Sequence, residues 1–272
     1  AASNVGSFGG LLAYPLLVEP GLALKAQSWL WTAGYALVFV AVAACALLLP
    51  RKAADQPHID ATSPAPSRKR VAHWIALAFV PSGLMLATSS FLTTDIVAVP
   101  MLWVLPLGLY LLSFTIAFAA RRWPAEILTR FAPVTILMFG GLMIAGHNAN
   151  PELNALMALG LLFMVAVALH TQMYDLRPEP DRLTGFYLAM SVGGALGGVF
   201  AALIAPLVFD WTYEYPILIL AAGLLVPQVF LLPPFARLWR TNAQGKRIRV
   251  LLVALLVALI VWFGLFGPAG QL

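Results

Sequence analysis

The sequence predicts an all-α polytopic membrane protein that crosses the bilayer with about nine hydrophobic helices. Hydrophobic residues make up 61% of the 272 residues and charged residues only 10%, whereas an ordinary soluble domain has about 25% charged residues. A helix needs roughly 20 mainly apolar residues to cross the hydrocarbon core of a bilayer. Such stretches recur along almost the whole chain, so the composition excludes a soluble globular domain.

The predicted helices alternate with polar loops and divide the chain into four regions. In order, the spans are placed at residues 1–20, 29–49, 72–93, 98–119, 130–147, 153–172, 185–208, 215–233 and 249–267. The regions are the end of a first helical half at 1–49, a linker at 50–71, a second six-helix half at 72–233, and a loop with an additional C-terminal helix at 234–272. Pro, Ser and charged residues in the linker are typical of a disordered, solvated segment.

Charged residues bound the spans and set their orientation. The loops at 50–71, 120–129, 173–184 and 234–248, with flanking residues, hold 15 of the 16 Lys and Arg residues, and only Lys25 lies at the other face. Acidic residues mark that face, at Glu19, Asp95, Glu152, Asp210 and Glu214. Loops rich in Lys and Arg stay in the cytoplasm, so the basic loops are predicted to be cytoplasmic and the C-terminus external. The positive charge thus indicates topology and not nucleic-acid binding.

A short internal repeat links the first span to the seventh. Residues 1–13 (AASNVGSFGGLLA) and 189–201 (AMSVGGALGGVFA) agree at six of thirteen aligned positions. Each copy is followed by a proline and then by an acidic residue, Pro15 and Glu19 or Pro206 and Asp210. A shift of six helices with unchanged orientation describes two parallel six-helix halves, as in the major facilitator superfamily. On this scheme the sequence begins at the fifth of twelve helices, and the last span is an additional one.

Three stretches carry a family resemblance: SNVGSFGGLLAYPLLVEP (3–20), TTDIVAVPMLWVLPLGLYLLSF (93–114) and LRPEPDRLTGFYLAMSVGGALGGVF (176–200). They resemble the membrane part of fused major-facilitator/spermidine-synthase-like bacterial proteins, which implies a multi-pass protein of the bacterial inner membrane. In that family a soluble aminopropyltransferase-like domain usually follows the membrane domain. This sequence has no glycine-rich loop after a strand and no acidic residue placed for a ribose. We therefore expect no spermidine synthase activity and no cofactor.

Glycines spaced four residues apart are the first candidate functional positions. They form the pairs Gly6 and Gly10, Gly193 and Gly197, and Gly194 and Gly198. This spacing places both glycines on one face of a helix and lets a second backbone approach closely. We interpret them as helix-packing positions, with a conformational hinge as the alternative. On either interpretation, Gly194→Leu is expected to disrupt the fold or its motion.

Thr93, Thr94 and Asp95 form a candidate solute or proton site where the third span meets the outer face. A carboxylate near the apolar region of the bilayer is costly and is a site candidate by default. If it faces a central cavity, Asp95 would bind a cation or carry a proton. The alternative is a helix-end carboxylate in interfacial water, with the threonines as capping residues.

A polar stretch at the end of the sixth span is a candidate cytoplasmic gate, made of His170, Gln172, Asp175 and Arg177. Asp175 and Arg177 are expected to form an ion pair that breaks as the two halves rock. The alternative is a solvated loop in which Asp181 or Thr184 caps the next helix. His73 and His170 lie at cytoplasmic helix ends, but no further His pair or CxxCH motif supports haem ligation. No metal site is predicted.

Two functions of different kinds are compatible with these patterns. The repeated halves, the linker and the glycine-rich spans favour a small-solute transporter that works by alternating access. The spans at 98–119, 130–147 and 215–233 contain no internal charged residue to couple ion movement to a solute, which favours a non-transporting accessory subunit. Such a subunit would belong to a larger membrane complex or assist a separate synthase-like protein. The expected partners are the lipid bilayer and other membrane protein subunits, and not nucleic acid.

Overall fold

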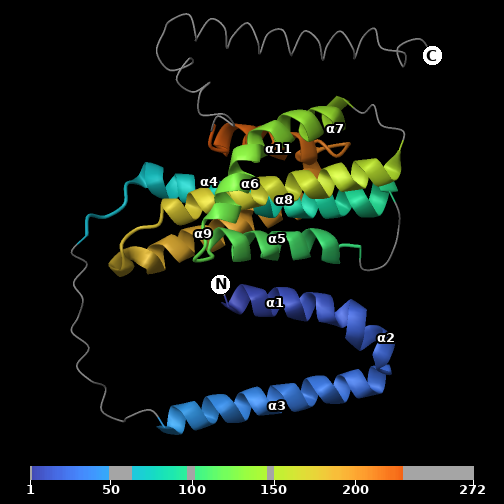
Figure 1. Cartoon of the computed structure of the whole chain (residues 1–272), viewed down its shortest axis with the longest axis vertical. Coiled ribbons are helices and arrows are strands. Elements are labelled where there is room, and N and C mark those ends of the chain that lie inside the picture. Colours follow the sequence, from blue (N-terminus) through green and yellow to red (C-terminus); the bar gives the residue numbers. More distant parts are fainter. Residues whose placement is uncertain (1, 49–62, 97–101, 146–149, 229–272) are drawn as a thin grey trace, which may run out of the picture.

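The computed structural model describes residues 2–48, 63–96, 102–145 and 150–228, and in these ranges it consists of helices without strands. The predicted all-α fold is therefore correct for the described part of the chain. Figure 1 shows a helical bundle with a hairpin of two helices along one side.

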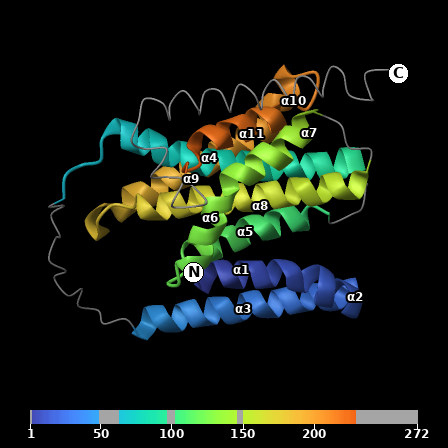
Figure 2. The same ribbon diagram turned by 45° about the horizontal axis from the view of Figure 1, so that its top comes forward.

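The N-terminal hairpin contacts the bundle through its first arm. α1 (Ala2–Ala13) continues through a π-helical turn (Tyr14–Val18) into α2 (Glu19–Gly21), and α3 (Leu24–Leu48) returns in the opposite direction. α1 packs along α5, whereas α3 lies on the far side of α1 from the bundle (Figures 1 and 2). Gln27 fixes the turn: it accepts a hydrogen bond from the Tyr14 hydroxyl at 3.2 Å and donates one to the Leu22 carbonyl oxygen at 2.8 Å.

The bundle consists of α4 to α11, and several of these helices contain a π-helical turn. Their bounds are α4 Arg68–Phe91 with the turn Leu92–Ile96, α5 Val104–Ala117, α6 Trp123–Thr135 with the turn Ile136–Gly140, α7 Gly141–Ala145, α8 Pro151–Asp175, α9 Leu183–Val199 with the turn Phe200–Ile204, α10 Ala205–Val208, and α11 Glu214–Leu225. A short 3-10 turn, Pro180–Arg182, precedes α9. Ser67 caps α4 and Asn150 caps α8, since each side chain accepts a backbone N–H of the first turn.

α8 is the central helix of the bundle. The side chains of residues 165–170 are completely buried, so this helix has no solvent-exposed or lipid-exposed face along that stretch. α4, α5 and α6 all pack against it, and α9 covers the other side of α4. A polar side chain within this stretch of α8 is therefore removed from both water and lipid.

α4 and α9 pack backbone to backbone through glycine. A Cβ atom at Gly193 would meet the carbonyl oxygen of Ile75, and one at Gly197 would meet that of Phe79. The Ser82 hydroxyl crosses the same contact and donates a hydrogen bond to the Gly194 carbonyl oxygen at 2.8 Å. Only glycine at 193 and 197 allows this approach.

The other glycines of the candidate set lie in open space. An added Cβ would meet nothing within 4 Å at Gly6, Gly10 or Gly194, and at Gly198 only the end of the Leu86 side chain at 3.6 Å. The close backbone approach therefore lies at Gly193, and the disruption expected from Gly194→Leu stays a prediction. A four-residue spacing identifies two glycines on one helical face, but Gly193 and Gly194 each define such a face, and the sequence does not show which face is covered.

The two copies of the sequence repeat have the same local structure. α1 continues into the turn Tyr14–Val18 and the short α2, and α9 continues into the turn Phe200–Ile204 and the short α10. A proline lies within or just after each π turn, at Pro15 and Pro206. The two prolines do not align in the repeat, because Pro15 corresponds to Leu203 and Pro206 to Val18. Each nevertheless removes a backbone donor close to its π turn.

Five helices of the described residues are long and apolar enough to cross a membrane: Leu24–Leu48, Arg68–Thr94, Trp123–Ala145, Pro151–Asp175 and Pro180–Val208. Each overlaps one predicted span. Val104–Ala117 and Glu214–Leu225 are apolar but shorter, and the predicted span at 1–20 is helical without being one of the five. The span at 249–267, the loop at 234–248 and linker residues 50–62 lie outside the described residues. The chain is an α-helical, multi-pass membrane protein.

Candidate functional site

His170 lies five residues before the end of α8, where α8 faces α5, and it is completely buried. Its Nδ1 is 2.8 Å from the Ser113 Oγ, and that hydroxyl is 2.6 Å from the Tyr110 carbonyl oxygen. A serine hydroxyl has one proton, and a carbonyl oxygen can only accept. Ser113 therefore donates to Tyr110 and accepts from His170, which assigns the proton of the neutral imidazole to Nδ1 and leaves Nε2 as an acceptor.

Two aromatic rings of α5 enclose the imidazole of His170. The Phe114 ring stacks on it with centroids 3.6 Å apart and planes 22° apart, and the Tyr110 ring meets it edge-on at 5.3 Å. Nε2 is buried and has no hydrogen-bond partner among the described residues. Buried polar atoms are normally paired, so this nitrogen can accept a hydrogen bond from a donor group of a bound solute.

Further polar side chains follow His170 along α8. The Gln172 Nε2 lies 3.4 Å from the His73 Nε2 on α4. The Thr171 Oγ1 and the Gln172 Oε1 are buried without a hydrogen-bond partner in the described part of the chain. Three successive residues, His170 to Gln172, thus place polar atoms inside the bundle.

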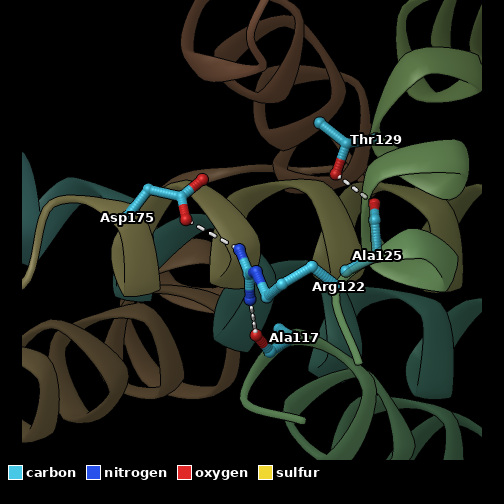
Figure 3. A network of polar contacts seen from close by, with 5 residues as sticks. All are labelled: Ala117, Arg122, Ala125, Thr129 and Asp175. Atoms are coloured by element: carbon cyan, nitrogen blue, oxygen red, sulfur yellow. Dashed lines mark hydrogen bonds and ion pairs between the residues drawn. The ribbon is translucent and has the colours of Figure 1, made fainter. Parts of the chain in front are cut away.

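An ion pair closes the basic end of α8 (Figure 3). The Arg122 Nη2 is 2.7 Å from the Asp175 Oδ1, and the Arg122 Nη1 donates to the Ala117 carbonyl oxygen at the end of α5. The Arg122 guanidinium also lies over the Tyr174 ring, 4.2 Å from its centroid. Arg122 therefore joins the ends of α5 and α8 at the start of α6.

The expected pair of Asp175 with Arg177 is not formed and is corrected to a pair with Arg122. The guanidinium of Arg177 lies instead 3.9 Å from the centroid of the Tyr174 ring. α8 ends at Asp175 and the chain turns at Leu176, so Arg177 does not follow on the helical face of Asp175. At the end of the helix, Asp175 therefore pairs with Arg122, a residue far away in the sequence.

Asp181 ties the end of the linker to the loop before α9. Its carboxylate accepts hydrogen bonds from the Ser63 backbone N–H at 3.0 Å and from the Ser63 hydroxyl at 2.7 Å, and Arg182 donates to the Ser63 carbonyl oxygen at 2.9 Å. The residue that caps α9 is Arg182, with no side-chain capping bond. The expected cap by Asp181 or Thr184 is therefore replaced by this contact.

Thr93 and Thr94 bond to their own helix. The Thr93 hydroxyl donates to the Ser89 carbonyl oxygen at 2.9 Å, and the Thr94 hydroxyl donates to that of Ser90. Their protons are thereby used within α4 and its π-helical turn. The backbone of Asp95 belongs to the turn Leu92–Ile96, and its side chain lies outside the described residues.

Sequence reasoning named His170 and Asp175 as candidates but not their partners, which are Ser113 and Tyr110 for His170 and Arg122 for Asp175. Ser113 stands in an apolar run, LPLGLYLLSF, where a single serine is usually a small packing residue. The only signal was that the predicted span at 98–119 has few other polar side chains to pair with a histidine. The partners come from α5 and from the start of α6, 57 and 53 residues from their counterparts on α8.

Comparison with family models, with curated proteins and with solved structures found no match to this chain. Within the described ranges, no group of three or more His, Cys, Asp and Glu side chains could hold a metal ion. The site is therefore defined by its own geometry: an imidazole acceptor enclosed by aromatic rings, followed along α8 by further polar side chains and an exposed ion pair.

Proposed function

We propose that this chain moves a small solute or a proton through the membrane by alternating access, with His170 as the buried binding group. The single observation that carries the proposal is the His170 Nε2, which is buried and has no partner among the described residues. An ionisable group inside a membrane bundle is costly and is usually retained for function. The resemblance to major-facilitator membrane domains supports the same conclusion, as an analogy of fold.

Arg122 and Asp175 have the geometry of a gate at the basic end of α8. Asp175 follows His170 by five residues on α8, which is about 7.5 Å along the helix axis. Their side chains are 25% and 59% exposed, and exposed ion pairs contribute only about 0–1 kcal/mol. The pair can thus break and form again at low cost as the ends of α5 and α8 separate.

Transport is tested with the full chain in proteoliposomes, by currents on a solid-supported membrane during a screen of small solutes. At least one solute should give a current several-fold above empty liposomes, and His170→Gln should abolish it. Thr115→Val is the control, because the Thr115 hydroxyl donates to the Leu111 carbonyl oxygen of its own helix, and this variant should retain most of the current. Full transport by His170→Gln would contradict the role of this site.

The alternative is a non-transporting accessory subunit, and α3 is the observation that favours it. No residue of its most apolar window is buried in the described structure, so the surface of this window is free to contact lipid or another subunit. Extraction in mild detergent followed by native mass spectrometry distinguishes the two functions. A stable larger assembly together with no solute current would support the accessory role.

The proposed orientation is that of a bacterial inner-membrane protein with its basic loops in the cytoplasm. Among the described bundle residues, Lys and Arg gather at the ends of α4, α5, α6, α8 and α9 that lie together, and Glu152, Asp210 and Glu214 lie at the opposite end. This distribution supports the orientation through the positive-inside rule. The complete nine-helix, major-facilitator-like arrangement is part of the same proposal.

A further inference from the structure

A pocket of about 490 Å³ lies at the acidic end of the bundle, where α4, α7, α8 and α11 meet. It is separate from His170, which lies near the basic end of α8. Small-molecule sites have volumes of about 300–1,000 Å³, so the pocket can hold a compact ligand. Its lining includes Phe91, Asn154, Trp211, Thr212, Tyr213 and Tyr215.

Aromatic rings supply most of the chemistry of this pocket. Trp211 and Tyr213 meet at 82° with centroids 5.4 Å apart, so the two rings form adjacent walls. Phe91 and Tyr215 stack with their planes 8° apart and centroids at 5.6 Å, which holds the third wall in place. The faces of aromatic rings are electron-rich and attract cations, Trp most strongly.

The charges around the pocket have one sign. Glu214 is 8% exposed and directly precedes Tyr215, while Glu152 and Asp210 are exposed at the same end. Every Lys and Arg of the described bundle belongs to the basic-end segments or to the first turns beyond them: Arg68, Lys69, Arg70, Arg121, Arg122, Arg130, Arg177 and Arg182. The local field therefore favours a cation and opposes an anion.

We propose that this pocket binds an organic ammonium ion, of the size of a methylated ammonium group with a short polar arm. The ring faces contact the cation, the acidic side chains attract it, and Asn154 and Thr212 supply polar contacts at the wall. The ammonium group can belong to a free solute or to a phospholipid headgroup, and the chemistry of recognition is the same in both.

The first test uses choline and its uncharged carbon isostere, 3,3-dimethylbutan-1-ol, with the full chain in phosphatidylglycerol nanodiscs that contain no ammonium lipid. Isothermal titration calorimetry should show choline binding at least ten-fold tighter than the isostere. Equal affinity would identify a merely apolar pocket and overturn the proposal, as would the absence of choline binding.

Matched variants locate the binding. Trp211→Ala should weaken choline binding at least ten-fold and Trp211→Phe much less, because phenylalanine retains a ring face. Trp123→Ala is the control, since Trp123 is equally exposed at the basic end and should bind as the wild type does. Trp211 and Tyr213 are both about half exposed or more, so Tyr213→Ala provides a second folded variant that should also lose binding. Wild-type affinity in both alanine variants would overturn the assignment.

Two further experiments distinguish a free solute from a lipid headgroup, and the ammonium site from the proposed transport site at His170. Dihexanoylphosphatidylcholine that competes at least ten-fold more strongly than choline would support a lipid headgroup, and weaker competition would support a free solute. His170→Gln should leave choline binding unchanged, because His170 is not part of this pocket. A loss of choline binding in that variant would contradict an independent ammonium site.

Discussion

At the scale of single residues, the contact between His170 and Ser113 determines the chemistry available inside the bundle. The hydroxyl accepts from Nδ1–H and donates to the Tyr110 carbonyl oxygen, so Nε2 can only accept. A buried donor that loses its partner costs about 1–3 kcal/mol. The contact therefore matters for stability as well as for the proposed transport.

Ser113→Ala should lower the free energy of unfolding by about 1–3 kcal/mol, because it leaves the His170 N–H buried without an acceptor. Thermal unfolding in detergent, followed by tryptophan fluorescence, measures the change. In the variant His170→Phe the ring stacks on Phe114 without a donor, so adding Ser113→Ala should cost clearly less than it does in the wild type. Additive effects of the two substitutions would contradict the hydrogen bond.

The sequence indicated His170 as a candidate through its residue type and position, but tertiary structure was needed to find its partners. Periodicity places residues along one helix, and it carries no information about which distant helix packs against it. The same limit explains why Asp175 was assigned to the nearby Arg177 and pairs with Arg122. Neighbours in sequence are poor guides to pairing at the end of a helix.

Arg122→Gln should destabilise the protein more than Asp175→Asn does. Arg122 loses the Ala117 carbonyl oxygen and the Tyr174 ring together with the ion pair, whereas Asp175→Asn loses only an exposed pair and should cost less than about 1 kcal/mol. Arg177→Gln is the control, because it removes one positive charge without breaking the ion pair of Arg122 with Asp175. Thermal unfolding at low and high salt checks this order, and an equal loss in the two variants would be inconsistent with it.

At the scale of elements, the contact of α4 with α9 shows what a glycine pattern can and cannot predict. The spacing predicts that α9 has a face suited to close packing, and Gly193 and Gly197 lie against the backbone of Ile75 and Phe79. The same spacing was assigned to Gly6 and Gly10 on α1, where an added Cβ meets nothing within 4 Å in the described structure. Helix positions follow from apolar runs, but the covering of each face depends on the rest of the fold.

Gly193→Ala and Gly197→Ala should each cost about 1–3 kcal/mol, the usual effect of forcing extra volume into a packed contact. Gly194→Ala is the matched control on the adjacent face, and it should be neutral or stabilise by up to about 1 kcal/mol, because alanine is the better helix former. Melting temperatures in a common detergent test the difference. A greater loss at 194 than at 193 would show that α4 and α9 pack on another face.

At the scale of the whole molecule, the separation of charge between the two ends of the bundle predicts how it sits in the membrane. Composition and span length are sufficient to predict a helical membrane protein, because a soluble fold of this size cannot remove so many apolar residues from contact with water. Five spans met this expectation in length and apolarity. The shorter α5 and α11 show that helix length alone does not identify every member of a bundle.

Single-cysteine labelling tests the orientation, since Cys45 is the only cysteine of the chain and is exposed. In a Cys45→Ala background, Asp210→Cys should react with a membrane-impermeant maleimide in intact cells. Arg121→Cys should react only after the membrane is permeabilised, because it lies at the basic end. Labelling of both positions from the same side would contradict the topology.

The π-helical turns have a mechanical consequence. Those at Tyr14–Val18, Leu92–Ile96, Ile136–Gly140 and Phe200–Ile204 all lie in the half of their helices nearer the acidic end. A π turn has wider backbone geometry than an α-helical turn and is found mostly as a single interruption. The force needed to pull a helix out of the bundle should therefore differ between its acidic and its basic end. An atomic-force tip that pulls helices out from the acidic side should meet lower rupture forces than one that pulls from the basic side.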